Sequence, residues 1–317
     1  MAMLDLFPPS KRDAVGRALA QLGPIGGIEP LAGGLSGAGV WQVRLEAGWV
    51  VLKIDKPPDG LNDPARQYAC MGIASEVGAA PKLLFADAVA GVSLVERIEA
   101  RPLPARRELL EAAAALLHRL HAAPAFPPLI DFPEGVAQLI VRLQGLDLVD
   151  PAALAPLLEL WPRLRADCRW GEDGLVASHN DPNPRNLIWD GQRLWLIDWE
   201  AAFRNDPFVD LAIMANYMAP GPDDDAALLE AYLGRRPTAA RLERLRSMRR
   251  LCRVYYGVVL INTAMGWRPP PGARRLEVAP LHEISAEIAA GRVTLAAPHE
   301  RFAYGAAMLN RVLADRA

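Results

Sequence analysis

The hydrophobic pattern of the chain changes once, near residue 100, and this change limits the fold class. Before it, apolar runs are short and broken by glycines, as in VWQVRLE and WVVLKI on either side of Ala47-Gly48. Such runs predict strands joined by tight turns. From Arg101 onward, apolar residues recur every three or four positions, which predicts helices. We therefore expect an α+β fold with two lobes, a β-rich N-lobe over residues 1–99 and a larger, mainly helical C-lobe over residues 100–317.

The N-lobe is expected to be a small antiparallel sheet with one flanking helix. KLLFADA and GVSLVERIE have the same strand character as the earlier runs, whereas residues 10–22 have a helical pattern that ends at Gly23-Pro24. Asp63 followed by Pro64 is a favourable N-cap and first helical residue, and Gly78 is a favourable stop. These signals place the flanking helix at residues 64–77.

The C-lobe has long amphipathic helices separated by proline-rich loops at residues 124–128 and 269–271. Two apolar stripes at helical spacing should face its core. They consist of Leu109, Ala113, Leu116, Leu117 and Leu120, and of Leu242, Leu245, Met248, Cys252, Tyr255 and Val259.

Composition excludes several classes of protein. A formal charge of −2 over 317 residues gives no broad basic field, so we expect no nucleic-acid partner and only small polyanionic ligands. The cysteines Cys70, Cys168 and Cys252 are widely spaced and lack CxxC pairs, which suits a reducing compartment and core positions. No stretch approaches the roughly 20 uncharged residues that span a bilayer, and the N-terminus lacks an apolar signal segment. We expect a cytoplasmic protein with no membrane partner.

The segment SHNDPNPRNLIWDGQRLWLIDWE, residues 178–200, concentrates polar side chains within an apolar run. Its two prolines oppose helix and central-strand pairing, so His179 to Asn186 should form a stiff loop. The apolar triplets on either side of Asp190-Gly191 predict a short hairpin, and Asp198 follows its end. Two carboxylates and one amide are therefore expected to converge near this hairpin.

Asp181, Asn186 and Asp198 match the needs of phosphoryl transfer. One carboxylate must orient or deprotonate the attacking hydroxyl, while a second carboxylate and a neutral oxygen hold Mg²⁺ on the nucleotide phosphates. An unrelated aspartate and a turn asparagine can also produce this spacing by chance. The order in which the other features occur along the chain argues against chance.

A glycine-rich loop precedes the hairpin of the N-lobe. Backbone N–H groups in such a loop can approach phosphate oxygens, although its spacing is neither a Walker A motif nor a regular GxGxxG, and alone it equally fits a hairpin tip. Lys53, on the following strand, could reach phosphates beneath the loop, or it could extend to water at a sheet edge. The loop residues are Gly33, Gly34, Ser36, Gly37 and Gly39.

Over nearly its whole length the chain resembles the protein-kinase-like small-molecule kinases of the aminoglycoside phosphotransferase and choline/ethanolamine kinase family. The resemblance implies a two-lobed protein-kinase-like fold, ATP and Mg²⁺ as cofactors, and transfer of the γ-phosphate to a hydroxyl of a small-molecule acceptor. The matching pieces are AGGLSGAG, VVLKI, GAAPKLL, LVERIEARPL, LLHRLHAAP, HNDPNPRNLI, LIDWE and NDPFVDLA.

The resemblance assigns roles to individual residues. Asp181 would be the catalytic base, and Asn186 and Asp198 would be the magnesium ligands. Lys53 and the glycine-loop residues would contact the nucleotide phosphates. The segment LVERIEA would be the interlobe hinge, with backbone groups near Glu96 and Ile98 facing the adenine.

Three further residues would support the site. His179 would order the catalytic loop without carrying a proton, and Asp210 would brace that loop. The family has a glutamate on the N-lobe helix that pairs with the strand lysine, but this chain has Gln67 at that place. Glu76 lies nine residues further on, which at about 100° per residue is roughly the opposite helix face. Gln67 can accept a hydrogen bond from Lys53 but has no charge, so the lysine's orientation would rest on another acid.

The sequence defines the acceptor molecule less well than it defines the reaction. The segment NDPFVDLAIMANYM is most similar to the choline kinase branch, which favours a choline-like acceptor. A quaternary ammonium needs aromatic rings and a nearby acid, for which Trp199, Tyr217 and Glu200 are candidates, although aromatic residues at helical spacing are usually core. The alternative is an aminoglycoside or another antibiotic or metabolite. Asp223-Asp224-Asp225 would attract a polycation, but these acids equally cap a helix that begins near residue 224.

Two readings of other classes remain. The missing glutamate allows a catalytically silent, nucleotide-binding pseudokinase. The intact Asp181, Asn186 and Asp198 of residues 178–200, which we call the catalytic segment after their predicted role, argue against it. An arginine-rich helix allows a nucleic-acid-binding module, but its arginines are expected on a solvated face and no recognition motif accompanies them. These arginines are Arg241, Arg244, Arg246, Arg249, Arg250 and Arg253.

Overall fold

The computed structural model describes residues 3–31, 39–58 and 62–315. Its internal contacts group the chain into two compact units, each made of two segments. Unit 1 comprises Met1–Leu129 and Asp173–Pro237, and unit 2 comprises Ile130–Glu172 and Thr238–Ala317. This grouping places the catalytic segment in the same unit as the sheet, whereas the predicted lobes separate them at residue 99. The lobe boundary at residue 99 therefore stays a prediction.

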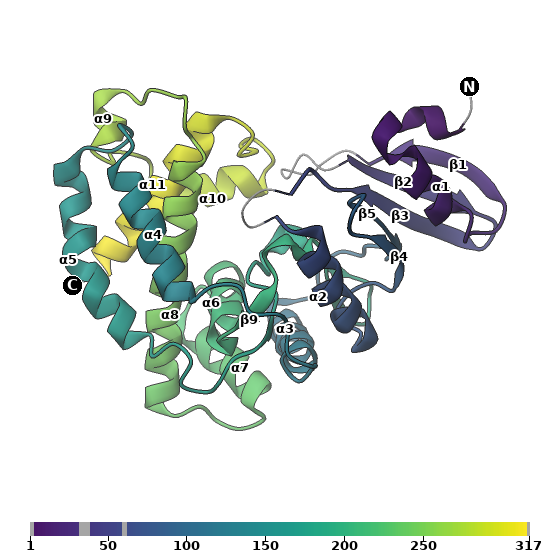
Figure 1. The fold of residues 1–317 in the computed structure, drawn as a ribbon. Coiled ribbons are helices and arrows are strands. Elements are labelled where there is room, and N and C mark those ends of the chain that lie inside the picture. The colour runs from purple at the N-terminus through teal and green to yellow at the C-terminus, as the bar shows by residue number, and fades with distance from the viewer. Residues whose placement is uncertain (1–2, 32–38, 59–61, 316–317) are drawn as a thin grey trace. The chain divides into compact units, whose positions relative to one another are not determined.

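A five-stranded sheet forms the first part of unit 1 (Figure 1). All neighbouring strands are antiparallel, in the order β1-β2-β3-β5-β4, which confirms the predicted antiparallel sheet. Glu46 and Ala47 form the tight turn between β2 and β3, and Gly48, with φ of +139°, begins β3 opposite Leu45. The strands are β1 (Ile25–Pro30), β2 (Gly39–Leu45), β3 (Gly48–Ile54), β4 (Leu83–Asp87) and β5 (Val92–Glu96).

Two helices accompany the sheet. The predicted flanking helix is α2 (Pro64–Glu76), whose N-cap Asp63 accepts a hydrogen bond from the Ala65 N–H at 3.0 Å. Helix α1 (Arg12–Leu19) also packs on the sheet, where its Val15 side chain shares a buried apolar cluster with β3 and β5. Two short 3₁₀ turns, η1 (Met3–Leu6) and η2 (Pro9–Lys11), precede α1.

The rest of unit 1 holds the catalytic segment. The predicted hairpin is confirmed, since β7 (Leu187–Trp189) pairs with β8 (Leu194–Leu196) and the Asp190 carboxylate accepts from the N–H groups of its turn. Four residues of the predicted apolar stripe after residue 105 are buried, and the fifth, Leu109, is only half-buried near the start of the helix. The remaining elements are α3 (Arg106–His121), β6 (Val176–Ser178), η3 (Pro184–Asn186), η4 (Trp199–Ala201), β9 (Phe203–Asn205), α6 (Pro207–Met218) and α7 (Pro222–Leu233).

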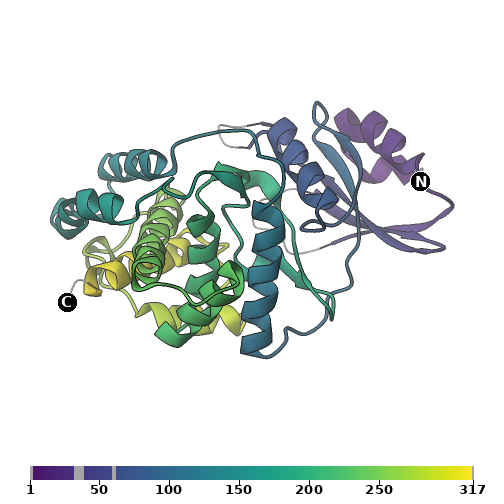
Figure 2. The same ribbon diagram turned by 90° about the horizontal axis from the view of Figure 1, so that it is seen from below.

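Unit 2 is made of helices, of which α4 and α5 lie side by side in Figures 1 and 2. Leu245, Met248 and Cys252 on α8 are fully buried, as their spacing predicts. The helices are α4 (Phe132–Gln144), α5 (Pro151–Asp167), α8 (Ala239–Asn262), α9 (Pro271–Arg274), α10 (Leu281–Ala289) and α11 (Pro298–Ala314).

The expectation that the arginines of α8 lie mostly on a solvated face is wrong for Arg244 and Arg249. Arg244 is 0% exposed and donates to the backbone carbonyls of Cys168 and Arg169, and Arg249 is also buried. Arginine enters the core here because backbone carbonyls at the end of α5 accept its N–H groups. The three cysteines are buried free thiols, as expected. Among residues 3–31, 39–58 and 62–315, no helix is long and apolar enough to cross a bilayer.

Candidate active site

The loop between β6 and β7 is rigid because local bonds and prolines fix its backbone. Asn180 adopts the left-handed conformation, with φ of +64°, at the point where the chain leaves β6. Asn183 then caps the 3₁₀ turn η3 by accepting from the Arg185 N–H at 2.9 Å. Pro182 and Pro184 restrict the intervening backbone dihedrals. The segment from His179 to Asn186 is thus the stiff loop that its sequence predicts.

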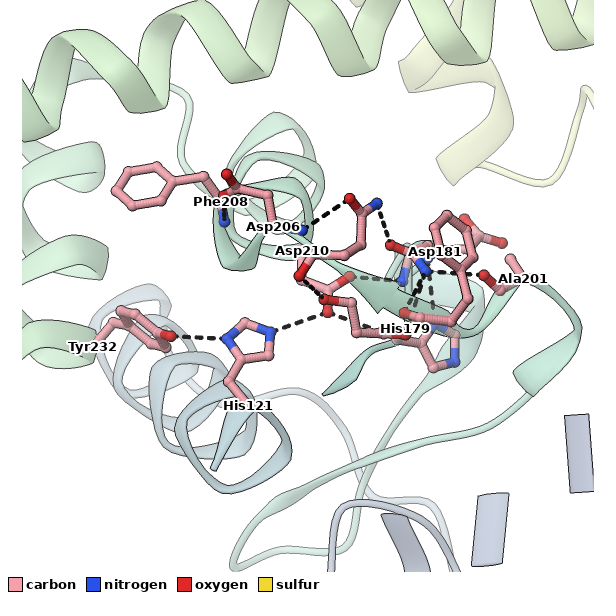
Figure 3. Close-up of polar contacts among 12 residues, drawn as sticks. His121, His179, Asp181, Ala201, Asp206, Phe208, Asp210 and Tyr232 are labelled. Atoms are coloured by element: carbon pink, nitrogen blue, oxygen red, sulfur yellow. Dashed lines mark hydrogen bonds and ion pairs between the residues drawn. The ribbon is translucent and has the colours of Figure 1, made fainter. Parts of the chain in front are cut away.

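Asp210, in the first turn of α6, holds the start of this loop (Figure 3). Its carboxylate is 0% exposed and accepts the backbone N–H groups of His179 at 2.9 Å and Asn180 at 2.7 Å. These contacts are the ones expected of a residue that braces the catalytic loop. Two backbone N–H groups on one carboxylate fix both the position and the direction of the loop.

A chain of polar contacts continues behind Asp210. His121, at the end of α3, has its Nε2 atom 3.1 Å from Asp210 Oδ2 and its Nδ1 atom 2.8 Å from the Tyr232 hydroxyl (Figure 3). This arrangement connects α3, α6 and α7 through one buried carboxylate. The sequence interpretation missed His121 and Tyr232, although His121 lies within the quoted piece LLHRLHAAP. Its position next to Asp210 requires the tertiary fold.

His179 is a neutral structural residue in this environment. Its side chain is buried, its Nε2–H donates to the Ile197 carbonyl at 3.0 Å, and its Nδ1 accepts from the Asp181 N–H at 3.3 Å. Burial holds the pKa of His179 below its ordinary value, outweighing the opposing effect of the Asp210 charge. An Nδ1 atom that accepts a hydrogen bond also requires the neutral ring. These contacts tie the ring to both ends of the segment, and the role of His179 in ordering the loop stays a prediction.

Asp181 and Asn186 are brought together across η3. The Asn186 amide donates to Asp181 Oδ2 at 3.0 Å and to the Asp181 carbonyl at 2.9 Å, while the Asn183 amide donates to Oδ1 at 2.9 Å. The Asp181 carboxylate is therefore held by two side-chain amides. Because the amide nitrogen of Asn186 is engaged in this way, the amide oxygen is the atom that Asn186 can offer to a cation.

Asp198 comes next to Asn186 through the hairpin. The Ile197 N–H donates to the Asn186 carbonyl at 2.9 Å, and Asp198 itself adopts a left-handed conformation, with φ of +64°. This unusual backbone places its carboxylate against β3, where Oδ1 lies 2.9 Å from Lys53 Nζ. The structure thus brings the strand lysine to the end of the segment that carries Asp198.

Lys53 lies between two carboxylates, since Asp55 Oδ1 is also 3.2 Å from its Nζ atom. Burial alone would lower the pKa of Lys53, but the charges of Asp198 and Asp55 together outweigh it and raise that pKa. Lys53 is therefore a charged ammonium at neutral pH. Asp55 was not identified from the sequence, although its position two residues after Lys53 puts it on the same face of the strand.

Helix α2 is attached to the segment after Asp198. The buried Arg66 guanidinium donates to the backbone carbonyls of Glu200 and Ala202. Burial, followed by the charge of Asp198, raises the pKa of the Glu200 carboxyl. The sequence interpretation missed Arg66. Nothing in the residues around it indicates that an arginine in the first turn of this helix is buried.

Gln67 does not make the expected contact with Lys53. Its side chain is only 2% exposed, and its Oε1 atom has no hydrogen-bond partner among the described residues. The partners of Lys53 are the two acids instead, as the lack of charge on Gln67 requires. That Gln67 occupies the place of the family's helix glutamate stays a prediction.

The aromatic candidates for an acceptor pocket differ in placement. Trp199 is 1% exposed, and its ring packs edge-on against His179 at 4.6 Å between centroids and against Phe126 at 6.1 Å. This burial favours a packing role beneath the catalytic loop over contact with an acceptor. Tyr217 is half-buried near the end of α6.

The nucleotide-binding candidates are described only in part. Gly33, Gly34, Ser36 and Gly37 lie outside the described residues. Gly39 begins β2, where an added Cβ would clash with the Trp41 ring.

The predicted hinge follows β5. The Glu96 N–H donates to the Lys82 carbonyl at 2.9 Å, and Ile98 comes just after the sheet. The role of Glu96 and Ile98 toward adenine stays a prediction.

The side chains available for a metal fit Mg²⁺. Within the described parts of the chain, no cluster of three or more His, Cys, Asp or Glu side chains forms a metal site. Asn186 and Asp198 offer one amide oxygen and one carboxylate, adjacent through the Ile197–Asn186 hydrogen bond. Mg²⁺ prefers oxygen ligands and is commonly held by one or two protein groups together with substrate phosphates. Asn186 and Asp198 would therefore hold it jointly with a nucleotide.

Comparison with protein families gives one match to most of the chain. The family model described as "Phosphotransferase enzyme family" matches residues 27–245 of this chain. This range contains the five-stranded sheet apart from the first two residues of β1, and it contains the whole catalytic segment. Every residue discussed in this site lies within the range.

Among curated proteins, the N-acetylmuramate/N-acetylglucosamine kinase of Caulobacter vibrioides is 30% identical over 207 residues. The alignment covers 55% of this chain and 56% of that protein, so the match spans about half the length of the relative.

Solved structures resemble the chain over nearly its full length. A choline/ethanolamine kinase family protein from Mesorhizobium loti has a TM-score of 0.63 and 19% identity, covering 96% of this chain and 98% of that one. Choline kinase LicA from Streptococcus pneumoniae has a TM-score of 0.64 and 17% identity with the same coverage. Macrolide and aminoglycoside phosphotransferases are further neighbours. At these identities the likeness establishes the fold, a two-lobed α+β kinase fold.

The buried neutral state of His179 predicts how stability depends on pH. The folded-state pKa of His179 is lowered, so the unfolded chain takes up a proton at this residue at a higher pH than the folded chain does. The free energy of unfolding therefore falls as the pH drops below about 6.5. Urea unfolding at pH 7.5, 6.5 and 5.5 measures this loss. His179→Gln should make the free energy of unfolding depend less steeply on pH. The number of protons taken up on unfolding should fall by up to one per molecule.

The exposed His282 provides the control, since His282→Gln should keep the wild-type dependence. A His179→Gln protein with the unaltered wild-type slope would show that His179 takes up its proton equally in the folded and unfolded chains.

Proposed function

This chain belongs to the phosphotransferase enzyme family whose model matches residues 27–245, and from that premise we propose that it transfers the γ-phosphate of ATP to a hydroxyl of a small molecule. The observation that carries the proposal is the contact of Lys53 with Asp198 at 2.9 Å. This contact brings a phosphate-binding cation next to a metal-binding carboxylate, with the Asp181–Asn186 pair attached through the hairpin. A kinase needs these groups in one place.

Asp181 acts on the acceptor. Its carboxylate, held by Asn183 and Asn186, aligns the acceptor hydroxyl and takes its proton as the oxygen attacks the γ-phosphorus. The new oxygen–phosphorus bond forms while the bond to the β-phosphate oxygen breaks, and ADP leaves. Holding the carboxylate with two amides limits its rotation, so that the hydroxyl is aligned before the reaction.

Lys53, Asn186 and Asp198 act on the nucleotide. The Lys53 ammonium would neutralise charge on the phosphate oxygens, and the amide oxygen of Asn186 and the carboxylate of Asp198 would hold the metal. When bound, Mg²⁺ supplies positive charge that stabilises the phosphates as they separate. His179 stays neutral and keeps the loop in place.

Two acceptor classes have specific support. The curated relative at 30% identity is named for amino sugars, which favours a sugar hydroxyl as the first acceptor to test. The choline kinases match more of the chain, 96%, but at 17–19% identity, so a choline-like acceptor is the second candidate. The burial of Trp199 removes one aromatic residue from a possible ammonium-binding box. A cytoplasmic location fits both classes, because ATP is available there and the three free thiols suit a reducing compartment.

Acceptor-dependent release of ADP tests the reaction class. The purified protein with ATP and Mg²⁺ should release ADP faster when one of a panel of hydroxyl compounds is added. The panel comprises N-acetylglucosamine, N-acetylmuramate, choline, ethanolamine, thiamine, homoserine, aminoglycosides and macrolides. Binding of ATP without turnover on any member would favour a pseudokinase, and failure to bind either ATP or Mg²⁺ would contradict the proposed site.

Substitution of the two carboxylates separates their roles. Asp181→Asn removes proton acceptance without removing a metal ligand, so kcat should fall on the order of 10³-fold while affinity for ATP·Mg²⁺ is nearly unchanged. Asp198→Asn should lower kcat and also weaken nucleotide binding, in a way that excess Mg²⁺ partly relieves. The measurement is kcat together with ATP affinity at low and high Mg²⁺ for each variant.

Asp223→Asn is the matched control, since Asp223 is exposed at the start of α7 and should leave both quantities unchanged. Rescue of Asp181→Asn by magnesium, or equal loss of nucleotide by both variants at saturating metal, would contradict the assignment of base and ligand.

A further inference from the structure

Lys53 has an acid on its own strand in addition to the metal-binding Asp198. We propose that Asp55, oriented by the Tyr68 hydroxyl, is the positioning residue that holds Lys53 against the nucleotide phosphates, in the role that a helix carboxylate would otherwise fill. The proposal rests on the proposed function, because it concerns how Lys53 meets ATP.

The backbone fixes Asp55 relative to Lys53. Asp55 directly follows β3, and its N–H donates to the Gly91 carbonyl at 2.8 Å, which extends the pairing of Ile54 with Val92. Residues two apart on an extended strand point to the same face, so both side chains leave the sheet on one side. The resulting contact of 3.2 Å joins Lys53 Nζ to Asp55 Oδ1.

Tyr68 fixes the other oxygen of the carboxylate. Its hydroxyl donates to Asp55 Oδ2 at 2.5 Å, and both residues are buried, at 5% exposure for Tyr68 and 6% for Asp55. Burial and then the hydrogen bond to Asp55 raise the pKa of the Tyr68 hydroxyl, so it remains a donor. With one oxygen on Tyr68 and the other on Lys53, the carboxylate has a single orientation.

Helix α2 therefore acts on Lys53 through Tyr68 rather than through Gln67. Gln67 precedes Tyr68, yet its Oε1 atom is buried without a hydrogen-bond partner among the described residues. On the other side of Gln67, Arg66 donates to the carbonyls of Glu200 and Ala202. One turn of α2 thus contacts both the acid that orients Lys53 and the segment that carries Asp198.

Two acids on Lys53 have different tasks. In the proposed reaction Asp198 would also hold the metal, which would share its charge and weaken its contact with Lys53. Asp55 lies outside the metal-binding set and keeps its full charge for the ammonium. A buried ammonium needs a compensating charge at all times, because an unpaired charge in the core is strongly unfavourable. Asp55 supplies this charge while the nucleotide is bound.

Calorimetric titration with a non-hydrolysable ATP analogue and Mg²⁺ tests the proposal without requiring the acceptor. Asp55→Asn should weaken analogue binding about tenfold, and Tyr68→Phe, which removes only the hydroxyl, about threefold. Because Tyr68 acts through Asp55, adding Tyr68→Phe to Asp55→Asn should weaken binding no further. With an identified acceptor, the KM for ATP should rise while the KM for the acceptor is unchanged.

Glu29→Gln is the control, an exposed acid on β1 of the same sheet that should bind the analogue as the wild type does. Thermal unfolding of each variant shows whether it is folded, and Tyr68→Phe retains the ring should Asp55→Asn not fold.

Wild-type affinity in both single variants, or additive losses in the double variant, would overturn the positioning role and leave the proposed function standing. Failure of the wild-type protein to bind the analogue would overturn both.

Discussion

The ion pairs of Lys53 determine how the site of this chain is assembled. Its ammonium contacts Asp198, 145 residues away in sequence, and Asp55, two residues away on its own strand. A largely buried lysine is stable only when opposite charges compensate the loss of hydration. The first contact joins the five-stranded sheet to the catalytic hairpin, and the second fixes the direction of the side chain.

A second buried charge supports the catalytic loop from behind. The Asp210 carboxylate accepts two backbone N–H groups of the loop and contacts His121, which in turn contacts Tyr232. His179 and Trp199 fill the space beneath the loop, and the neutral ring of His179 uses both nitrogens for backbone contacts. The loop therefore presents Asp181 and Asn186 from a backbone that is already ordered. Such preorganisation is what phosphoryl transfer requires, since positioning and electrostatics supply most of its rate enhancement.

Local sequence signals predicted the parts of the fold that local chemistry controls. The hairpin after Asn186 follows from its turn residues, and α2 begins at Asp63-Pro64 because an N-cap and a proline at the first position favour that start. Contacts between distant segments had weaker signals or none. Asp55 and His121 lie beside residues that the sequence did single out, yet their partners are identified only once the chain folds. Arg244 resembled a surface arginine because carbonyl acceptors at the end of another helix cannot be read from its own neighbours. The buried Trp199 likewise resembled a ligand-binding aromatic.

The most direct test of this account is a crystal structure of the protein with ADP and Mg²⁺. The account predicts that the Asn186 amide oxygen and the Asp198 carboxylate lie about 2.1 Å from the metal. It also predicts that Lys53 Nζ contacts a nucleotide phosphate while it keeps its hydrogen bond to Asp55. A metal held by other side chains, or a Lys53 that leaves Asp55 or points away from the phosphates, would contradict it.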